Sequence, residues 1–128
     1  MLEKIPLFEG VQQQALDSLE KKLQPRSYDK GDLIIRQGDE GSAMFIVLSG
    51  RLKVYSTNEE GKEALLDFYG ANDYFGELAL LDSDVRSASV IAVEDSDLIR
   101  ITRAELMNFL QQYPEAAAGL QTTGTPGS

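Results

Sequence analysis

Glycines divide the middle of this chain into short β-rich runs, and their spacing limits the fold more than any other feature. They stand at Gly31, Gly38, Gly41, Gly50, Gly61, Gly70 and Gly76. The β-rich runs are 32–36, 43–49, 51–57, 63–69, 86–93 and 95–102. Turn signals about every 8–12 residues are typical of an all-β sandwich or barrel. The run 43–49 is almost continuously apolar, which predicts a strand buried on both faces.

Two turns and two helical segments complete the predicted architecture. Asn58–Gly61 is expected to be a hairpin loop, and Ser49–Gly50 a tight turn between two strong strands. Apolar residues recur at helical spacing over 11–23, ahead of Pro25, which predicts a helix there. Thr102 and Glu105 have the spacing of a capping box, so a second helix should begin there and end at Tyr113–Pro114. The chain is therefore predicted to be mainly β, with one helix before the strands and one or two after them.

Composition sets the size of the fold and excludes several chemistries. The chain has 128 residues, enough for one domain, which we place at 1–120. Residues 121–128 contain only polar residues, Gly and Pro, which predicts a disordered tail or the point at which a longer chain was cut. There is no Cys and no His, so thiolate chemistry and the commonest general base are excluded. The net charge of -9 argues against direct contact with nucleic acid by this segment. No apolar run is long enough to span a membrane and no signal peptide is evident, so a cytoplasmic location is expected.

The stretch 74–88 is the strongest candidate for a binding site. Residues 74–81 are predicted to form a single helical turn, with Gly76 at its start. The free N–H groups at a helix start attract an anion. Glu77 adds a hydrogen-bond acceptor, and Arg86 adds a forked cation that suits a phosphate. Together they predict a ligand that is partly anionic and partly hydroxylated, such as a sugar phosphate.

Two motifs, in the right order, resemble those of the cyclic nucleotide-binding domain family. The resemblance covers about residues 5 to 115. The motifs are Gly31-Asp32, Gln37-Gly38-Asp39, then Phe45-Ile46-x-x-x-Gly50, and, further on, Gly70-x-x-Asp73-Tyr74-Phe75-Gly76-Glu77-Leu78-Ala79-Leu80 followed by Arg86-Ser87-Ala88. The resemblance implies an eight-stranded jelly-roll β-barrel with flanking helices, which holds cAMP or cGMP as ligand and needs no cofactor or metal.

The resemblance also implies a role for each residue of the second motif. Glu77 would accept the ribose 2′-hydroxyl, and Arg86 would pair with an oxygen of the cyclic phosphate. The Ser87 hydroxyl would reach the phosphate or the base. Backbone N–H groups would supply the remaining donors, from Gly76, Glu77, Leu78, Ala79, Ser87 and Ala88. Two departures stand out: Val85 replaces a common Pro, and the long helix that usually covers the base is short, absent or supplied by residues outside this sequence.

Each of these residues also has a plainer interpretation. Arg86 could be a surface residue that pairs with Asp84 or Glu77, and Glu77 could merely be an acid in a helix's first turn. Tyr74 and Phe75 are expected in the core rather than stacked on a ligand. The Asp82-x-Asp84 pair is expected at the surface rather than on a metal.

The predicted function is a non-catalytic cyclic nucleotide sensor that couples binding to rearrangement of its flanking helices. The leading context is the regulatory part of a bacterial transcription regulator, with a possible homodimer through a missing C-terminal helix. The alternatives are a regulatory domain of a channel, transporter or kinase, or a degenerate domain that binds no nucleotide and contacts proteins. An enzyme on a similar jelly roll, such as a cupin, would need a His-rich metal site, which this chain lacks.

Overall fold

The computed structural model describes residues 2–5, 8–76 and 84–116. The helices and strands, in chain order, are η1 (Leu2–Lys4), α1 (Gln13–Glu20), β1 (Pro25–Tyr28), β2 (Leu33–Ile35), β3 (Glu40–Gly41), β4 (Ala43–Ser49), β5 (Leu52–Thr57), β6 (Glu63–Tyr69), β7 (Tyr74–Phe75), β8 (Asp84–Val85), β9 (Ser89–Ala92), β10 (Ser96–Thr102) and α2 (Arg103–Gln112). The predicted tail at 121–128 lies outside the described residues.

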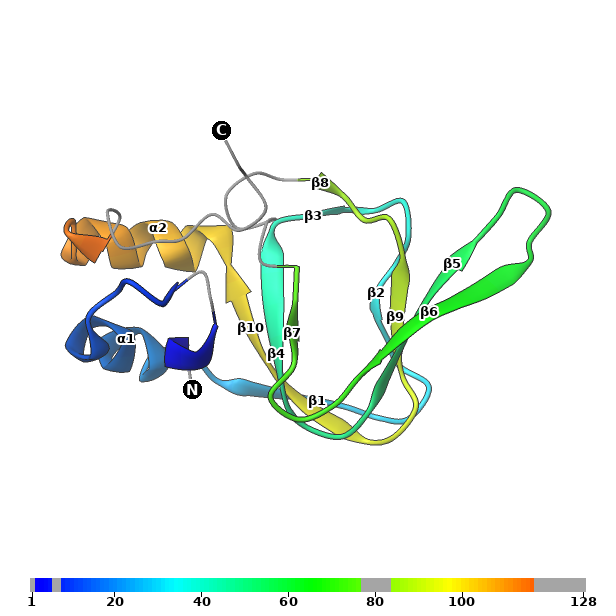
Figure 1. Ribbon diagram of the computed structural model, residues 1–128, viewed down its shortest axis with the longest axis horizontal. Helices are drawn as coiled ribbons and strands as arrows, with labels where there is room; N and C mark the ends of the chain where they lie inside the picture. The colour runs from blue at the N-terminus through cyan, green and yellow to red at the C-terminus, as the bar shows by residue number, and fades with distance from the viewer. Residues whose placement is uncertain (1, 6–7, 77–83, 117–128) are drawn as a thin grey trace.

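Two antiparallel sheets of four strands face each other, in the orders β1-β10-β4-β7 and β2-β9-β5-β6. A small third sheet pairs β3 with β8 along one edge of the space between them (Figure 1). The β5–β6 ribbon extends well beyond the other strands, while α1 and α2 lie together on the far side of the first sheet (Figure 1). The predicted class, a mainly β jelly roll with flanking helices, is confirmed. The described strands form separate sheets, however, and not one closed barrel of eight strands.

Strand β4 lies between two cores, as its continuous apolar run predicts. Because successive side chains of a strand point to opposite faces, Met44 and Ile46 enter one core while Phe45 and Val47 enter the other. The core on the helix side also contains Leu2, Ile5, Phe8, Val11, Ala15, Leu16, Leu19, Leu23, Ile99, Ile101, Leu106, Phe109 and Ala116. The core between the sheets also contains Ile35, Leu52, Val54, Phe75, Val90, Ala92 and Leu98.

The two predicted turns have different outcomes. Asn58–Gly61 closes the β5–β6 hairpin as expected, and the Asn58 side chain accepts hydrogen bonds from the backbone N–H groups of Glu60 and Lys62 at 3.0 and 2.9 Å. Ser49–Gly50 does not join paired strands. It is a corner at which the chain leaves one sheet and enters the other, since β4 and β5 belong to different sheets.

The helices follow the predicted pattern, but α1 differs from the prediction at both ends. It runs from Gln13 to Glu20 and is shorter than the predicted 11–23. Helix α2 has the predicted capping box: Thr102 Oγ1 accepts from the N–H of Glu105 at 3.2 Å, and the Glu105 carboxylate accepts from the N–H of Thr102 at 3.0 Å. The helix ends just before Tyr113, also as predicted.

One prediction about the central motif was wrong. Tyr74 and Phe75 form strand β7 rather than the beginning of a helical turn, because they pair with Ile46 and Phe45 of β4. The rest of the predicted turn, from Glu77 onward, lies outside the described residues.

The β-rich runs of the sequence did not predict strands β1, β3 and β8, which are short and carry few apolar residues. Of the helices in the described ranges, none has the length and apolar character needed to span a bilayer.

Candidate functional site

The candidate site is a cavity of about 430 Å³ between the ribbon β5–β6 and the segments that follow β7 and β8. This volume lies within the usual range for small-molecule sites. Its lining combines apolar side chains with a few polar groups, and consists of Ile35, Val54, Leu66, Asp67, Tyr69, Phe75, Gly76, Arg86, Ser87, Ala88 and Val90. The cavity thus brings together four of the predicted site residues, Gly76, Arg86, Ser87 and Ala88.

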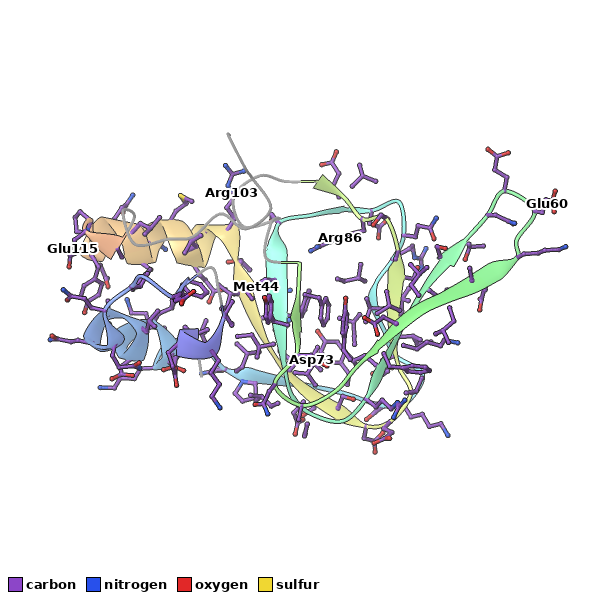
Figure 2. All side chains as sticks on the ribbon, viewed as in Figure 1. Met44, Glu60, Asp73, Arg86, Arg103 and Glu115 are labelled. Carbon is purple, nitrogen blue, oxygen red and sulfur yellow. The ribbon has the colours of Figure 1, made fainter. Side chains whose placement is uncertain are left out.

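Arg86 is held by backbone bonds to the turn that follows β2. Its N–H donates to the carbonyl of Asp39 at 2.7 Å, and its carbonyl accepts from the N–H of Gly38 at 2.8 Å. The side chain is half-buried, and its Nη2 donates to the carbonyl of Ala43 at 2.7 Å. Figure 2 shows Arg86 in the region between the two large sheets, below the β3–β8 edge. This placement differs from the surface position that the plainer interpretation gave it.

The Arg86 guanidinium packs directly on the backbone of Gly41. A Cβ atom at residue 41 would overlap the Nε of Arg86 and lie 2.5 Å from its Cζ and Nη2. Real Cβ atoms never approach other atoms this closely, so any side chain at this position would displace the guanidinium. Gly41 was counted among the turn glycines in the sequence, and nothing in its neighbours distinguishes it from the others.

Gly76 also lies close to the same guanidinium, beside its Nη1. Its φ of 81° falls in the left-handed region, which glycine adopts without strain. A Cβ there would lie 2.9 Å from both the Arg86 Nη1 and the carbonyl oxygen of Ala43. Gly76 therefore lets the chain turn after β7 while the Arg86 fork passes close to its backbone.

The remaining predicted residues divide into two groups. Ser87 is exposed and Ala88 is half-buried, and both line the cavity beside Arg86. Glu77, Leu78 and Ala79 lie outside the described residues, so their predicted roles stay predictions.

Stacked aromatic rings support one side of the cavity. The rings of Tyr69 and Phe75 are nearly parallel, with centroids 4.9 Å apart, and Phe75 stacks in turn on Phe45 at 5.2 Å. Phe75 is 6% exposed, which agrees with its predicted place in the core, and it also contributes to the cavity wall. Such offset ring pairs stabilise a fold beyond their buried area, so this side of the site is firmly held.

Sequence reasoning missed the contribution of strand β6. Leu66 and Asp67 line the cavity, although the sequence assigned them only to a strand. Ala43 was missed as well, because its role depends on its backbone carbonyl and not on its side chain. The apolar walls from Ile35, Val54 and Val90 could be expected only as core residues.

Within residues 2–5, 8–76 and 84–116, no group of three or more acidic side chains is arranged to hold a metal ion. A separate cleft of about 230 Å³ lies between α1 and α2, lined in part by Leu19, Lys22 and Phe109. It contains none of the predicted binding residues, so the cavity around Arg86 is the candidate site.

Comparison with protein families agrees with this geometry. The family model described as the cyclic nucleotide-binding domain matches residues 25–113, which is more than half of the chain. The chain therefore belongs to the cyclic nucleotide-binding domain family. This match includes the cavity, both motifs and helix α2.

Relatives with this domain occur in proteins of different kinds. The chain is 36% identical over 115 residues to the cyclic AMP receptor protein of Thermus thermophilus, covering 90% of this chain and 53% of that protein. It is 37% identical over 108 residues to human cGMP-dependent protein kinase 2, covering 84% of this chain and 14% of the kinase. Among solved structures, it matches the N-terminal domain of a transcriptional regulator from Streptomyces coelicolor with a TM-score of 0.85 and 28% identity, covering 93% of this chain and 83% of that one. The chain spans about half the length of the bacterial regulators it matches.

Proposed function

We propose that this chain is a non-catalytic sensor domain that binds a 3′,5′-cyclic nucleotide in the cavity around Arg86. The observation that carries the proposal is the Arg86 guanidinium, which lines a cavity of suitable size while Gly41 and Gly76 allow its close approach. A cyclic phosphodiester has one negative charge, and the guanidinium can donate to it through two N–H groups.

Local hydrogen bonds have to supply the affinity, because the chain as a whole repels anions. Its net charge is -9, so long-range steering opposes the approach of a phosphate. A hydrogen bond to a charged group contributes about 1.5–3 kcal/mol. In our proposal, the N–H groups of Gly76, Ser87 and Ala88 add to the contact made by Arg86. Glu77 accepts the ribose 2′-hydroxyl, and Leu78 and Ala79 contribute backbone donors, as the family resemblance implies.

The flanking helices are the proposed output of the sensor. Strand β10 leads directly into α2 through the capping box of Thr102, and α2 packs with α1 in the core on the far side of the first sheet. A ligand changes such an arrangement only if it binds one state more tightly than the other. We propose residues 1–120 as the sensor domain, with 121–128 as a tail.

The context that we favour is the regulatory part of a bacterial transcription regulator. The relatives from Thermus thermophilus and Streptomyces coelicolor are described as a cyclic AMP receptor protein and as a transcriptional regulator. In such a protein, an effector domain would lie outside the present sequence. A second copy of the chain would complete a homodimer. The ligand proposed is cAMP or cGMP, and the domain itself catalyses no reaction.

Isothermal titration with cAMP and with cGMP tests the proposal. We expect at least one of them to bind, and Arg86→Ala to weaken that binding about tenfold or more. Arg103→Ala is a matched control, since Arg103 is an exposed arginine on α2, away from the cavity (Figure 2). It should bind like the unchanged protein. The proposal would be overturned if neither cAMP nor cGMP gave binding heat at millimolar concentration.

A further inference from the structure

An acidic side chain, Asp67, lines the same cavity as Arg86. Its position follows from the register of the β5–β6 ribbon. Val54 pairs with Asp67, whereas the next residue, Tyr55, pairs with Leu65. Leu66 is thus the extra residue of a β-bulge, where two residues of one strand oppose one of its partner. The bulge explains why two consecutive residues of β6, Leu66 and Asp67, both line the cavity.

The carboxylate of Asp67 is oriented by the backbone of its own strand. Its Oδ1 accepts a hydrogen bond from the N–H of Phe68 at 2.8 Å. Asp67 shares the cavity face with Val54, because directly paired residues of two strands point to the same side. Within the described part of the chain, Oδ2 of Asp67 takes no such backbone bond, so it can accept a donor from a ligand.

Asp67 is exposed, so water can solvate its carboxylate, but its negative charge still lowers the affinity of the cavity for an anion because like charges repel. The repulsion is offset if the ligand offers the carboxylate a hydrogen-bond donor. The phosphate of a cyclic nucleotide has no donor, and the proposed function assigns the ribose 2′-hydroxyl to Glu77. The donors that remain belong to the base. They are the exocyclic amino group of adenine, guanine and cytosine and the ring N–H of guanine and uracil, and only the amino group is common to cAMP and cGMP.

We infer that Asp67 recognises the base of the cyclic nucleotide by accepting a hydrogen bond from its exocyclic amino group. This inference rests on the proposed function and adds the selectivity of the same site. The neighbouring wall suits a flat ring, since Val54, Leu66 and Val90 line the cavity with aliphatic groups. Leu66 is 55% exposed, so a base placed against it would remove apolar surface from water.

Two pairs of ligands that differ only in the amino group test the inference. The first pair is cAMP and the 3′,5′-cyclic monophosphate of purine riboside, which lacks the 6-amino group. The second is cGMP and the 3′,5′-cyclic monophosphate of inosine, which lacks the 2-amino group. In the unchanged protein, the amino-bearing member of at least one pair should bind about tenfold more tightly, the lower end of the range for a hydrogen bond to a charged group. In Asp67→Ala this preference should fall below about twofold, while Asp67→Asn, which keeps an acceptor oxygen, should retain part of it.

The ratio within a pair is the deciding quantity, because removal of a negative charge raises the affinity for every anionic ligand. Glu63→Ala measures that general effect: Glu63 lies on the same strand, is exposed and does not line the cavity. It should leave both ratios unchanged. Equal affinity within both pairs, or a preference that survives in Asp67→Ala, would overturn the inference and leave the proposed function intact. If no nucleotide binds the unchanged protein, the proposed function fails, and this inference fails with it.

Discussion

The guanidinium of Arg86 occupies the space that a side chain at Gly41 would need. These residues are far apart in the sequence, and β3 and β8 bring them together, since Gly41 pairs with Asp84 two residues before Arg86. The missing side chain on β3 therefore sets where the cation of the site can lie. Gly41 is a positioning residue, because it acts on the ligand only through Arg86.

Gly41→Ala should weaken cyclic nucleotide binding about tenfold or more, since the added methyl group displaces the guanidinium from its place. Titration calorimetry measures the effect. The matched control is Gly70→Ala, because no atom lies within 4 Å of a Cβ built at Gly70. If both variants bind as the unchanged protein does, Gly41 does not position Arg86.

The Gly41→Ala change should have no further effect once Arg86 is removed. In an Arg86→Ala background the guanidinium is absent, so the methyl group has nothing to displace. We therefore expect the double variant to bind no more weakly than Arg86→Ala alone, a clear departure from additivity. Additive losses would mean that Gly41 acts on the site by another route.

Arg86→Lys should bind more weakly than the unchanged protein and more tightly than Arg86→Ala. Lysine keeps the positive charge but lacks the planar fork that can hold the Ala43 carbonyl and a phosphate oxygen together. Competition with a fluorescent cyclic nucleotide would rank the three proteins. An affinity for Arg86→Lys equal to that of the unchanged protein would show that charge alone is sufficient.

Thr102→Ala should lower the free energy of unfolding by about 1 kcal/mol through loss of the capping box. The backbone N–H of Glu105 then loses the hydroxyl that accepts from it at 3.2 Å. Urea denaturation followed by circular dichroism measures the change. Asn108→Ala, an exposed change within the same helix, should leave stability equal or slightly higher. Equal stability of Thr102→Ala and the unchanged protein would argue against the cap.

Phe75→Leu should lower the free energy of unfolding by about 1–3 kcal/mol, since it removes ring contacts with both Tyr69 and Phe45. Phe68→Leu is its counterpart on the outer ribbon, where the ring is 39% exposed and lies 4.4 Å from the Arg51 guanidinium carbon. That change should cost less than about 1 kcal/mol. Denaturant melts of the two variants compare them directly, and the reverse order would contradict the packing described here.

Much of the fold could be predicted because its strands carry strong local signals. Strands β4 and β6 have the predicted bounds, as their apolar runs are long and end at clear turn residues. The capping box was also local, since Thr102 and Glu105 are three residues apart. By contrast, β3, β7 and β8 have two residues each, and they are strands only because a partner distant in the sequence lies beside them.

The residues of the candidate site that fall within one sequence motif could be predicted. The residues that strand register brings into the cavity could not. Gly76, Arg86, Ser87 and Ala88 fall within one stretch, so a single pattern could bring them into view. Asp67 enters the cavity because of a bulge opposite Val54 and Tyr55, and no local signal in the sequence marks a bulge there. The same holds for the carbonyl of Ala43, whose residue type has no bearing on its role.

The edge position of β1 has a consequence for synthesis of the chain. In its sheet β1 lies beside β10, and residues 25–28 pair with residues 96–99. A strand made early on the ribosome thus waits for one made near the end of the domain, and domains generally fold as units during translation. The nascent chain must therefore emerge almost whole before its first sheet can be completed. A ribosome that stalls before β10 would carry an incomplete domain to which chaperones could bind.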